Sequence, residues 1–216
     1  MASSPTILHA SGVTRVTLGA SVSCNVGDLI GFDGSNWVLA DADARVAAEF
    51  VAMETQPAGG SVAVCQAGVL YDPDAPFTAG SSYYLSTTAG SYAPTPPAAS
   101  ATLTILQRVG KAVTTDTLAF NVLRHGPLFL RAQVTYDPAS LAATTARNDT
   151  VSVTGLLTTD VVRGGSTVNN ALEAGLVISQ MDVSAADTLR IRLHNPTAGA
   201  VDGASLIHTI VVERYT

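Results

Sequence analysis

Short apolar runs separated by turn residues dominate residues 66–121, and this spacing restricts the fold more than any other feature of the chain. The runs are rich in Val, Ile, Thr, Tyr and Phe, residue types that favour β-strands, while Gly, Pro, Ser and Asp fill the gaps. They occupy residues 68–71, 83–86, 103–106 and 118–120. A helix needs apolar residues at three-and-four spacing over ten or more positions, which this stretch lacks. The spacing predicts a succession of short antiparallel strands.

Turn residues support the same interpretation outside this stretch. Asp33-Gly34 and Gly90-Ser91 are typical of hairpin turns, because Gly and Asp tolerate the left-handed backbone that such turns need. Residues 41–48 have some helical character and are alternatively a loop. Residues 137–143 predict a short helical turn that Asp137 would cap. The fold class that follows is all-β.

The second half of the chain repeats the pattern with its own strands. Gly126-Pro127 interrupts any strand and marks a domain boundary, and residues 164–166 are expected to form a loop. Six to eight strands in about 85 residues are typical of a jelly-roll-like β-sandwich. We therefore predict an N-terminal arm at 1–19, a first domain at 20–125 and a C-terminal sandwich at 126–216.

The first residues predict a strand that begins before the first domain. One interpretation places this strand in the sheet of its own domain, and the other makes it an arm that adds to a neighbouring subunit. The residues expected to make the contact in the second case are Thr6, Ile7, Leu8, Val13, Arg15 and Val16.

The chain is poor in charge. Charged residues make up 13% of it and apolar residues 47%, whereas about 25% charged residues is usual. Such a surface is expected to be covered by partners, although a β-rich protein coated in Thr, Ser and Ala is the plainer alternative. The net charge is −6 and the only Lys is Lys111, so we expect no direct nucleic-acid partner.

Two cysteines, Cys24 and Cys65, lie on apolar stretches without a second Cys or His at metal-ligand spacing. We expect buried free thiols in preference to a disulfide. The N-terminus lacks the pattern of a secretory signal, and no apolar run approaches 18 residues, so we expect synthesis in a cytoplasm and no membrane partner.

The sequence contains no recognisable catalytic motif. Its histidines, His9, His125, His194 and His208, are scattered, and no nucleophile elbow or phosphate-binding loop is present. We expect no enzyme activity, catalytic residue, cofactor or metal site. The acidic pairs at 41/43 and 72/74 are interpreted as turn residues in preference to cation ligands. Aromatic side chains are expected to pack inside the protein or between subunits in preference to lining a sugar-binding groove, and they are Trp37, Tyr71, Tyr83, Tyr84 and Tyr92.

Three segments of the first half share a pattern of turn glycines and apolar residues, and they are Ala-Val-Cys-Gln-Ala-Gly-Val-Leu at 63–70, Phe-Thr-Ala-Gly-Ser-Ser-Tyr-Tyr-Leu at 77–85 and Gln-Arg-Val-Gly-Lys-Ala at 107–112. On these segments, residues 20–122 resemble the small β-barrel modules of tailed-bacteriophage virion proteins, especially capsid decoration (cement) and head-fibre proteins. Residues 132–214 are similar to a C-terminal β-sandwich of phage minor structural proteins. That similarity rests on Thr-Val-Ser-Val-Thr-Gly-Leu at 150–156 and Asp-Thr-Leu-Arg-Ile-Arg-Leu-His-Asn-Pro-Thr at 187–197.

The resemblance implies a capsid decoration protein that binds the outer surface of an icosahedral head and bridges subunits of the major capsid protein. It implies a homotrimer first and a dimer next, with residues 6–18 as an arm on the capsid, and a location on the outside of the virion. The alternative is a head-fibre or tail-fibre/baseplate protein that binds a host-surface glycan or receptor. A cellular polysaccharide-binding β-sandwich is a third hypothesis, which the missing export signal disfavours.

Overall fold

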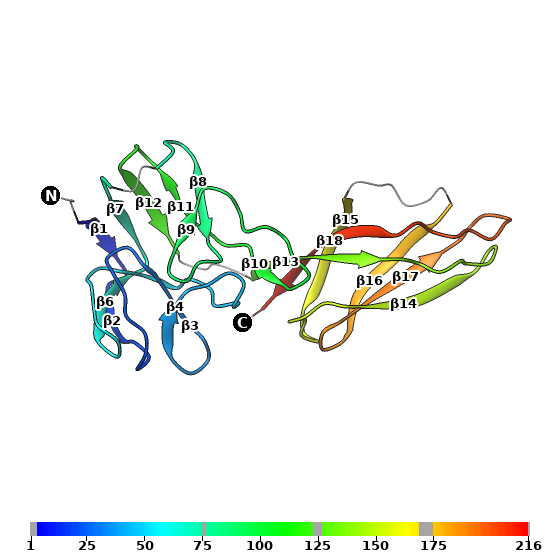
Figure 1. The fold of residues 1–216 in the computed structure, drawn as a ribbon, viewed down its shortest axis with the longest axis horizontal. Helices are drawn as coiled ribbons and strands as arrows, with labels where there is room; N and C mark the ends of the chain where they lie inside the picture. The colour runs from blue at the N-terminus through cyan, green and yellow to red at the C-terminus, as the bar shows by residue number, and fades with distance from the viewer. Residues whose placement is uncertain (1–3, 75–76, 123–126, 169–174, 216) are drawn as a thin grey trace. The chain divides into compact units, whose positions relative to one another are not determined.

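The computed structural model describes residues 4–74, 77–122, 127–168 and 175–215, with the side chains of 165–168 left aside. Every regular element among these residues is a β-strand, which confirms the all-β fold class (Figure 1). In the described part of the chain, no helix exists that is long and apolar enough to cross a lipid bilayer. The chain divides into two compact units, Met1–Ala98 with Ile105–Gly126, and Ala99–Thr104 with Pro127–Thr216.

The first unit contains two antiparallel sheets. One has six strands in the order β1-β7-β12-β11-β8-β9, and the other has five in the order β2-β6-β5-β3-β4. The strands are β1 (Thr6–Ser11), β2 (Thr14–Thr17), β3 (Leu29–Phe32), β4 (Trp37–Leu39), β5 (Phe50–Ala52), β6 (Ser61–Cys65), β7 (Ala67–Tyr71), β8 (Ser82–Leu85), β9 (Tyr92–Ala93), β11 (Arg108–Ala112) and β12 (Thr117–Asn121).

Alternating side chains build the core of this unit. In β6, Val62 and Val64 are fully buried, and they join a cluster with Val16, Leu18 and Ile30. The predicted turn between β3 and β4 is confirmed, because Gly34 has φ 101° and Asp33 Oδ1 accepts the N–H groups of Ser35 and Asn36 at 2.8 Å each. These contacts fix the pairing of short strands that would be unstable alone.

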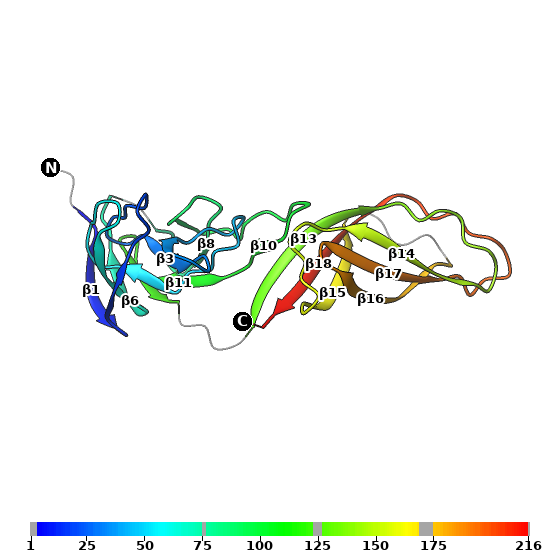
Figure 2. The same ribbon diagram turned by 90° about the horizontal axis from the view of Figure 1, so that it is seen from below.

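The second unit is a β-sandwich of two sheets (Figure 2). One sheet has the order β10-β13-β18-β15 and the other the order β14-β17-β16. The strands are β13 (Leu128–Tyr136), β14 (Ala146–Ser152), β15 (Val161–Val168), β16 (Val177–Ala185), β17 (Thr188–His194), β18 (Leu206–Arg214) and the short β10 (Thr104–Ile105), of which Thr104 belongs to this unit. Alternate residues of β17, Leu189, Ile191 and Leu193, are fully buried, as expected of strands with one inner face.

Several finer expectations differ from the structure. None of the four sheets formed by the described strands closes into a barrel, because each has two different end strands. Residues 41–48 follow the loop alternative and form a turn in which Asp41 and Val46 exchange backbone hydrogen bonds. Residues 137–143 contain no helical turn. The expected loop at 164–166 lies within β15, where Gly164, Gly165 and Ser166 pair with β18 and the register shift leaves Arg163 as a bulge. The predicted boundary between residues 125 and 126 falls within residues 123–126, which lie outside the described residues.

Candidate functional site

Residues 6–17, here called the N-terminal edge, form the outermost strands of both sheets in the first unit. β1 pairs with β7 from Thr6↔Tyr71 to Ser11↔Ala67, and β2 pairs with β6 from Thr14↔Val64 to Thr17↔Ser61. Because β6 and β7 are separated by one residue, Gln66, the two pairings follow one another along the chain. The first strand therefore belongs to a sheet of its own unit, as one of the two interpretations of the sequence predicted.

The side chains predicted to make contact are mostly exposed on this edge. Leu8 is 53% exposed and Val13 57%, while Thr6 and Arg15 are exposed and Ile7 is half-buried. Val16 is the exception, because it points into the core.

The N-terminal edge has no Lys and no Pro in residues 6–17, although β1 has a register shift between Ile7 and His9. Natural proteins shield such edges with Lys, Pro or very short strands, since unpaired N–H and C=O groups accept a further strand. The one charged side chain of residues 6–17, Arg15, is held against its own sheet, donating to Glu54 Oε1 at 2.6 Å and to the Ser61 carbonyl at 2.7 Å. The other edges of this unit, β4 and β9, have three and two residues.

Gly68 on β7 permits β1 to lie where it does. A Cβ at this position would lie 2.1 Å from the carbonyl oxygen of His9 and 2.8 Å from Cζ of Phe120. Real carbon–oxygen contacts of this kind are far longer, so only glycine allows the close approach of the two backbones.

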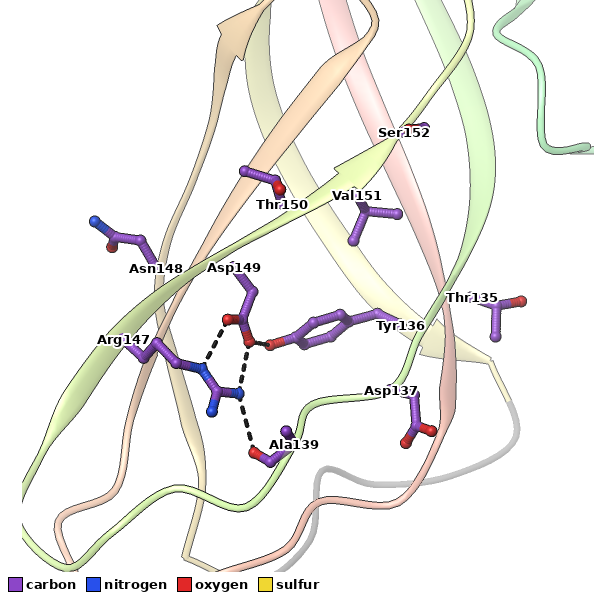
Figure 3. A pocket seen from close by; sticks show the side chains of 10 residues that line it. All are labelled: Thr135, Tyr136, Asp137, Ala139, Arg147, Asn148, Asp149, Thr150, Val151 and Ser152. Atoms are coloured by element: carbon purple, nitrogen blue, oxygen red, sulfur yellow. Dashed lines mark hydrogen bonds and ion pairs between the residues drawn. The ribbon is translucent and has the colours of Figure 1, made fainter.

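The second unit contains a shallow groove of about 720 Å³ along β14 (Figure 3). Residues of β14 form one wall, and Thr135, Tyr136 and Asp137 at the end of β13 form the other. We call it the β14 groove. β14 is the end strand of its sheet, and β17 pairs with only one of its edges.

A hydrogen-bonded triad spans the β14 groove. Arg147 donates to both carboxylate oxygens of Asp149, at 2.7 and 2.8 Å, and Tyr136 donates its hydroxyl to the same carboxylate (Figure 3). These bonds lower the pKa of Asp149 against the opposing effect of its burial, while burial and the Asp149 bond raise the pKa of Tyr136. These shifts keep the carboxylate ionised and the phenol protonated at neutral pH.

His208 on β18 lies in the interior of the same unit, with its ring centroid 6.1 Å from that of Tyr136. The side chain is buried, and Nε2 has no hydrogen-bond partner among the described residues. Burial lowers the pKa of His208, because the charged imidazolium is disfavoured away from water.

The free energy of unfolding of the second unit is therefore expected to fall as the pH decreases through 6.5. Below this ordinary pKa, His208 is protonated in the unfolded chain but stays neutral in the folded chain. The free energy of unfolding therefore changes by at most about 1.4 kcal/mol per pH unit. Urea unfolding at pH 8 and pH 5.5 measures the difference. His208→Leu should abolish most of it, while His194→Gln, at an exposed position, should retain it; an unchanged slope in His208→Leu would refute the assignment.

The aromatic and acidic side chains weighed as binding residues have structural roles. Phe77, Tyr83 and Tyr92 pack with ring centroids 5.4 to 6.0 Å apart, and Trp37 lies 5.3 Å from both Phe32 and Phe50. The packing interpretation is thus confirmed for Tyr83, Tyr92 and Trp37. In each acidic pair the second N–H bonds to the first carboxylate at 3.2 Å, as expected of turns. Burial and a hydrogen bond shared with Asp43 raise the pKa of Asp41 to about 6.

Both cysteines are buried and free, as predicted. Burial raises the pKa of both thiols, that of Cys65 to about 11. Over residues 4–74, 77–122, 127–168 and 175–215, no three His, Cys, Asp or Glu side chains gather in a way that would hold a metal ion.

Sequence reasoning missed the β14 groove entirely. The residues that build it, Arg147, Asp149 and Tyr136, come from two strands, and only the spacing of Arg147 and Asp149 on one face of a strand gave a signal.

Comparisons with known proteins found no relative of this chain. No family model, no curated protein and no solved structure matches this chain.

Proposed function

We propose that this chain is a bacteriophage capsid decoration protein that binds the outer surface of the icosahedral head and bridges major capsid protein subunits. The observation that carries the proposal is the N-terminal edge, two exposed end strands, β1 and β2, whose one charged side chain is bonded to its own sheet. The low charge of the chain and the sequence resemblance point the same way. The proposal also includes the finer fold assignment, a first domain like the small β-barrel modules and a C-terminal domain like a jelly roll.

Strand addition supplies the binding in this proposal. A segment of the capsid protein would pair with the free N–H and C=O groups of β1 and β2, and Leu8 and Val13 would pack beneath it. One such contact is modest, but a symmetric oligomer, a trimer first and a dimer next, would repeat it on a repeating shell, so avidity multiplies it. A role of this kind is mechanical and uses no catalytic group.

Leu8→Lys should weaken binding to shells of the cognate capsid protein by at least about tenfold, or about 1.4 kcal/mol per contact. The substitution places an ammonium group where the added strand would bury it, and lysine on an edge strand opposes strand addition. Co-sedimentation of the full chain with shells measures the bound fraction.

Val113→Lys is the matched control for this experiment. Val113 is 61% exposed and lies between β11 and β12, away from the N-terminal edge, so the same change in charge should leave binding intact. Equal binding of the wild-type chain and Leu8→Lys would exclude the N-terminal edge as the contact surface.

A further inference from the structure

The β14 groove follows the unpaired edge of a strand. Its lining includes six consecutive residues of β14, Arg147 to Ser152. Successive side chains of a strand point to opposite faces, so a hollow that touches all six lies alongside the backbone and not on one face of the sheet. The opposite edge of β14 is occupied by β17, from Ala146↔His194 to Ser152↔Thr188. The groove thus has the position of a missing neighbouring strand.

The chain already fills the next stretch of the same seam with an extended segment of its own. Ser100 accepts the N–H of Gln133 at 2.6 Å, two residues before Thr135 at the groove. Thr102 forms a parallel bridge with Thr154, two residues after Ser152, and Leu103 donates its N–H to the Thr154 carbonyl at 3.2 Å. Residues 99–104 therefore lie between β13 and the residues that follow β14. The groove occupies the adjoining stretch between β13 and β14, which these residues leave open.

The lining determines which occupant fits. Asn148, Thr150 and Ser152 are exposed and offer amide and hydroxyl groups. Arg147 and Asp149 neutralise one another, and Arg147 also donates to the Ala139 carbonyl at 2.9 Å, so neither is free to hold an opposite charge. Tyr136 is buried, with its hydroxyl bonded to Asp149, and so offers no exposed aromatic face to a sugar ring. An uncharged extended chain with small or hydroxyl side chains matches these surroundings.

We propose that the β14 groove binds an extended, uncharged peptide segment of a partner protein, which adds to β14 as a strand. The segment Ala-Ser-Ala-Thr-Leu-Thr at 99–104 is the template for this peptide, because it lies extended in the adjoining stretch, bonded to Gln133 of β13 and to Thr154 beyond the end of β14. This site is separate from the N-terminal edge and does not depend on the proposed capsid contact.

Amide NMR of the full chain with the capped peptide Ala-Ser-Ala-Thr-Leu-Thr as probe tests the proposal. Saturable shifts and slower hydrogen exchange are expected at residues 147–152. The same peptide N-methylated at every residue should bind at least about tenfold more weakly, because strand addition uses the backbone N–H groups of alternate residues and full methylation removes both sets. Equal binding of the two peptides, no shift at millimolar peptide, or shifts confined to Gln133 and Thr154, which would indicate exchange with residues 99–104, would each overturn it.

Thr150→Lys and Thr159→Lys form the matched pair of variants. Both positions are exposed, but only Thr150 lines the β14 groove, so only Thr150→Lys should reduce peptide affinity, by at least about fivefold. Similar losses in both variants would contradict the assignment. Maltohexaose serves as the alternative probe, and shifts of residues 147–152 by this sugar without a response to the peptide would identify a glycan site instead.

Discussion

Replacing Gly68 with alanine is expected to detach β1 from β7 and to abolish the proposed binding to the capsid shell. The added methyl group would lie 2.1 Å from the His9 carbonyl oxygen, a backbone atom that moves only if β1 moves. Amide exchange of β1 should become fast, and the free energy of unfolding of the first unit should fall by about 1–3 kcal/mol. Hydrogen exchange measured by mass spectrometry reports the first effect, and co-sedimentation reports the loss of binding.

This substitution also separates the two interpretations of the N-terminal residues. If binding requires β1 as part of the sheet, Gly68→Ala loses it. If the residues act as a released arm, the same variant should bind as well as the wild-type chain or better. Gly164→Ala is the control, because no atom lies within 4 Å of the added Cβ there, and it should leave exchange and binding unchanged.

Arg214→Met should destabilise the second unit by about 3–5 kcal/mol, because it leaves the carboxylate of Asp160 buried without a counter-charge. Arg214 is 14% exposed and Asp160 fully buried, and the guanidinium donates to both carboxylate oxygens at 2.7 Å. It donates as well to the Gly155 carbonyl at 2.7 Å. Urea unfolding followed by circular dichroism measures the change.

Arg190→Met is the matched control for Arg214→Met. Arg190 pairs with Asp182, but these side chains are 40% and 31% exposed, so water screens the pair and the expected loss is about 0–1 kcal/mol. If Arg214→Met does not fold, Arg214→Lys keeps the charge and should show an intermediate loss. Equal stability of Arg214→Met and Arg190→Met would refute the importance of the buried pair.

The sequence predicts strands and turns well wherever local chemistry decides them. The turn at Asp33-Gly34 needs a positive φ and an acceptor side chain, and both requirements are visible in two residues. Alternation along residues 188–193 likewise identifies β17 and its buried face. The helical expectation for residues 137–143 failed because an Asp followed by a Pro occurs in irregular connections as well as at the start of a helix.

The sequence does not show which distant residues pair with one another. Nothing in Ala-Ser-Ala-Thr-Leu-Thr shows that residues 99–104 belong to the second unit, because the contacts that hold them, with Gln133 and Thr154, are set by tertiary structure. The pairing of β1 with β7 was one of two open interpretations for the same reason: an exposed strand carries little information about which neighbour it joins. The β14 groove depends on two such pairings at once.

Electron microscopy of phage particles that contain this chain locates it without any assumption about its contacts. As a decoration protein it should give density at many equivalent lattice points on the outside of the head, with β1 and β2 facing the shell. Density found only at the tail or baseplate would contradict the proposed function.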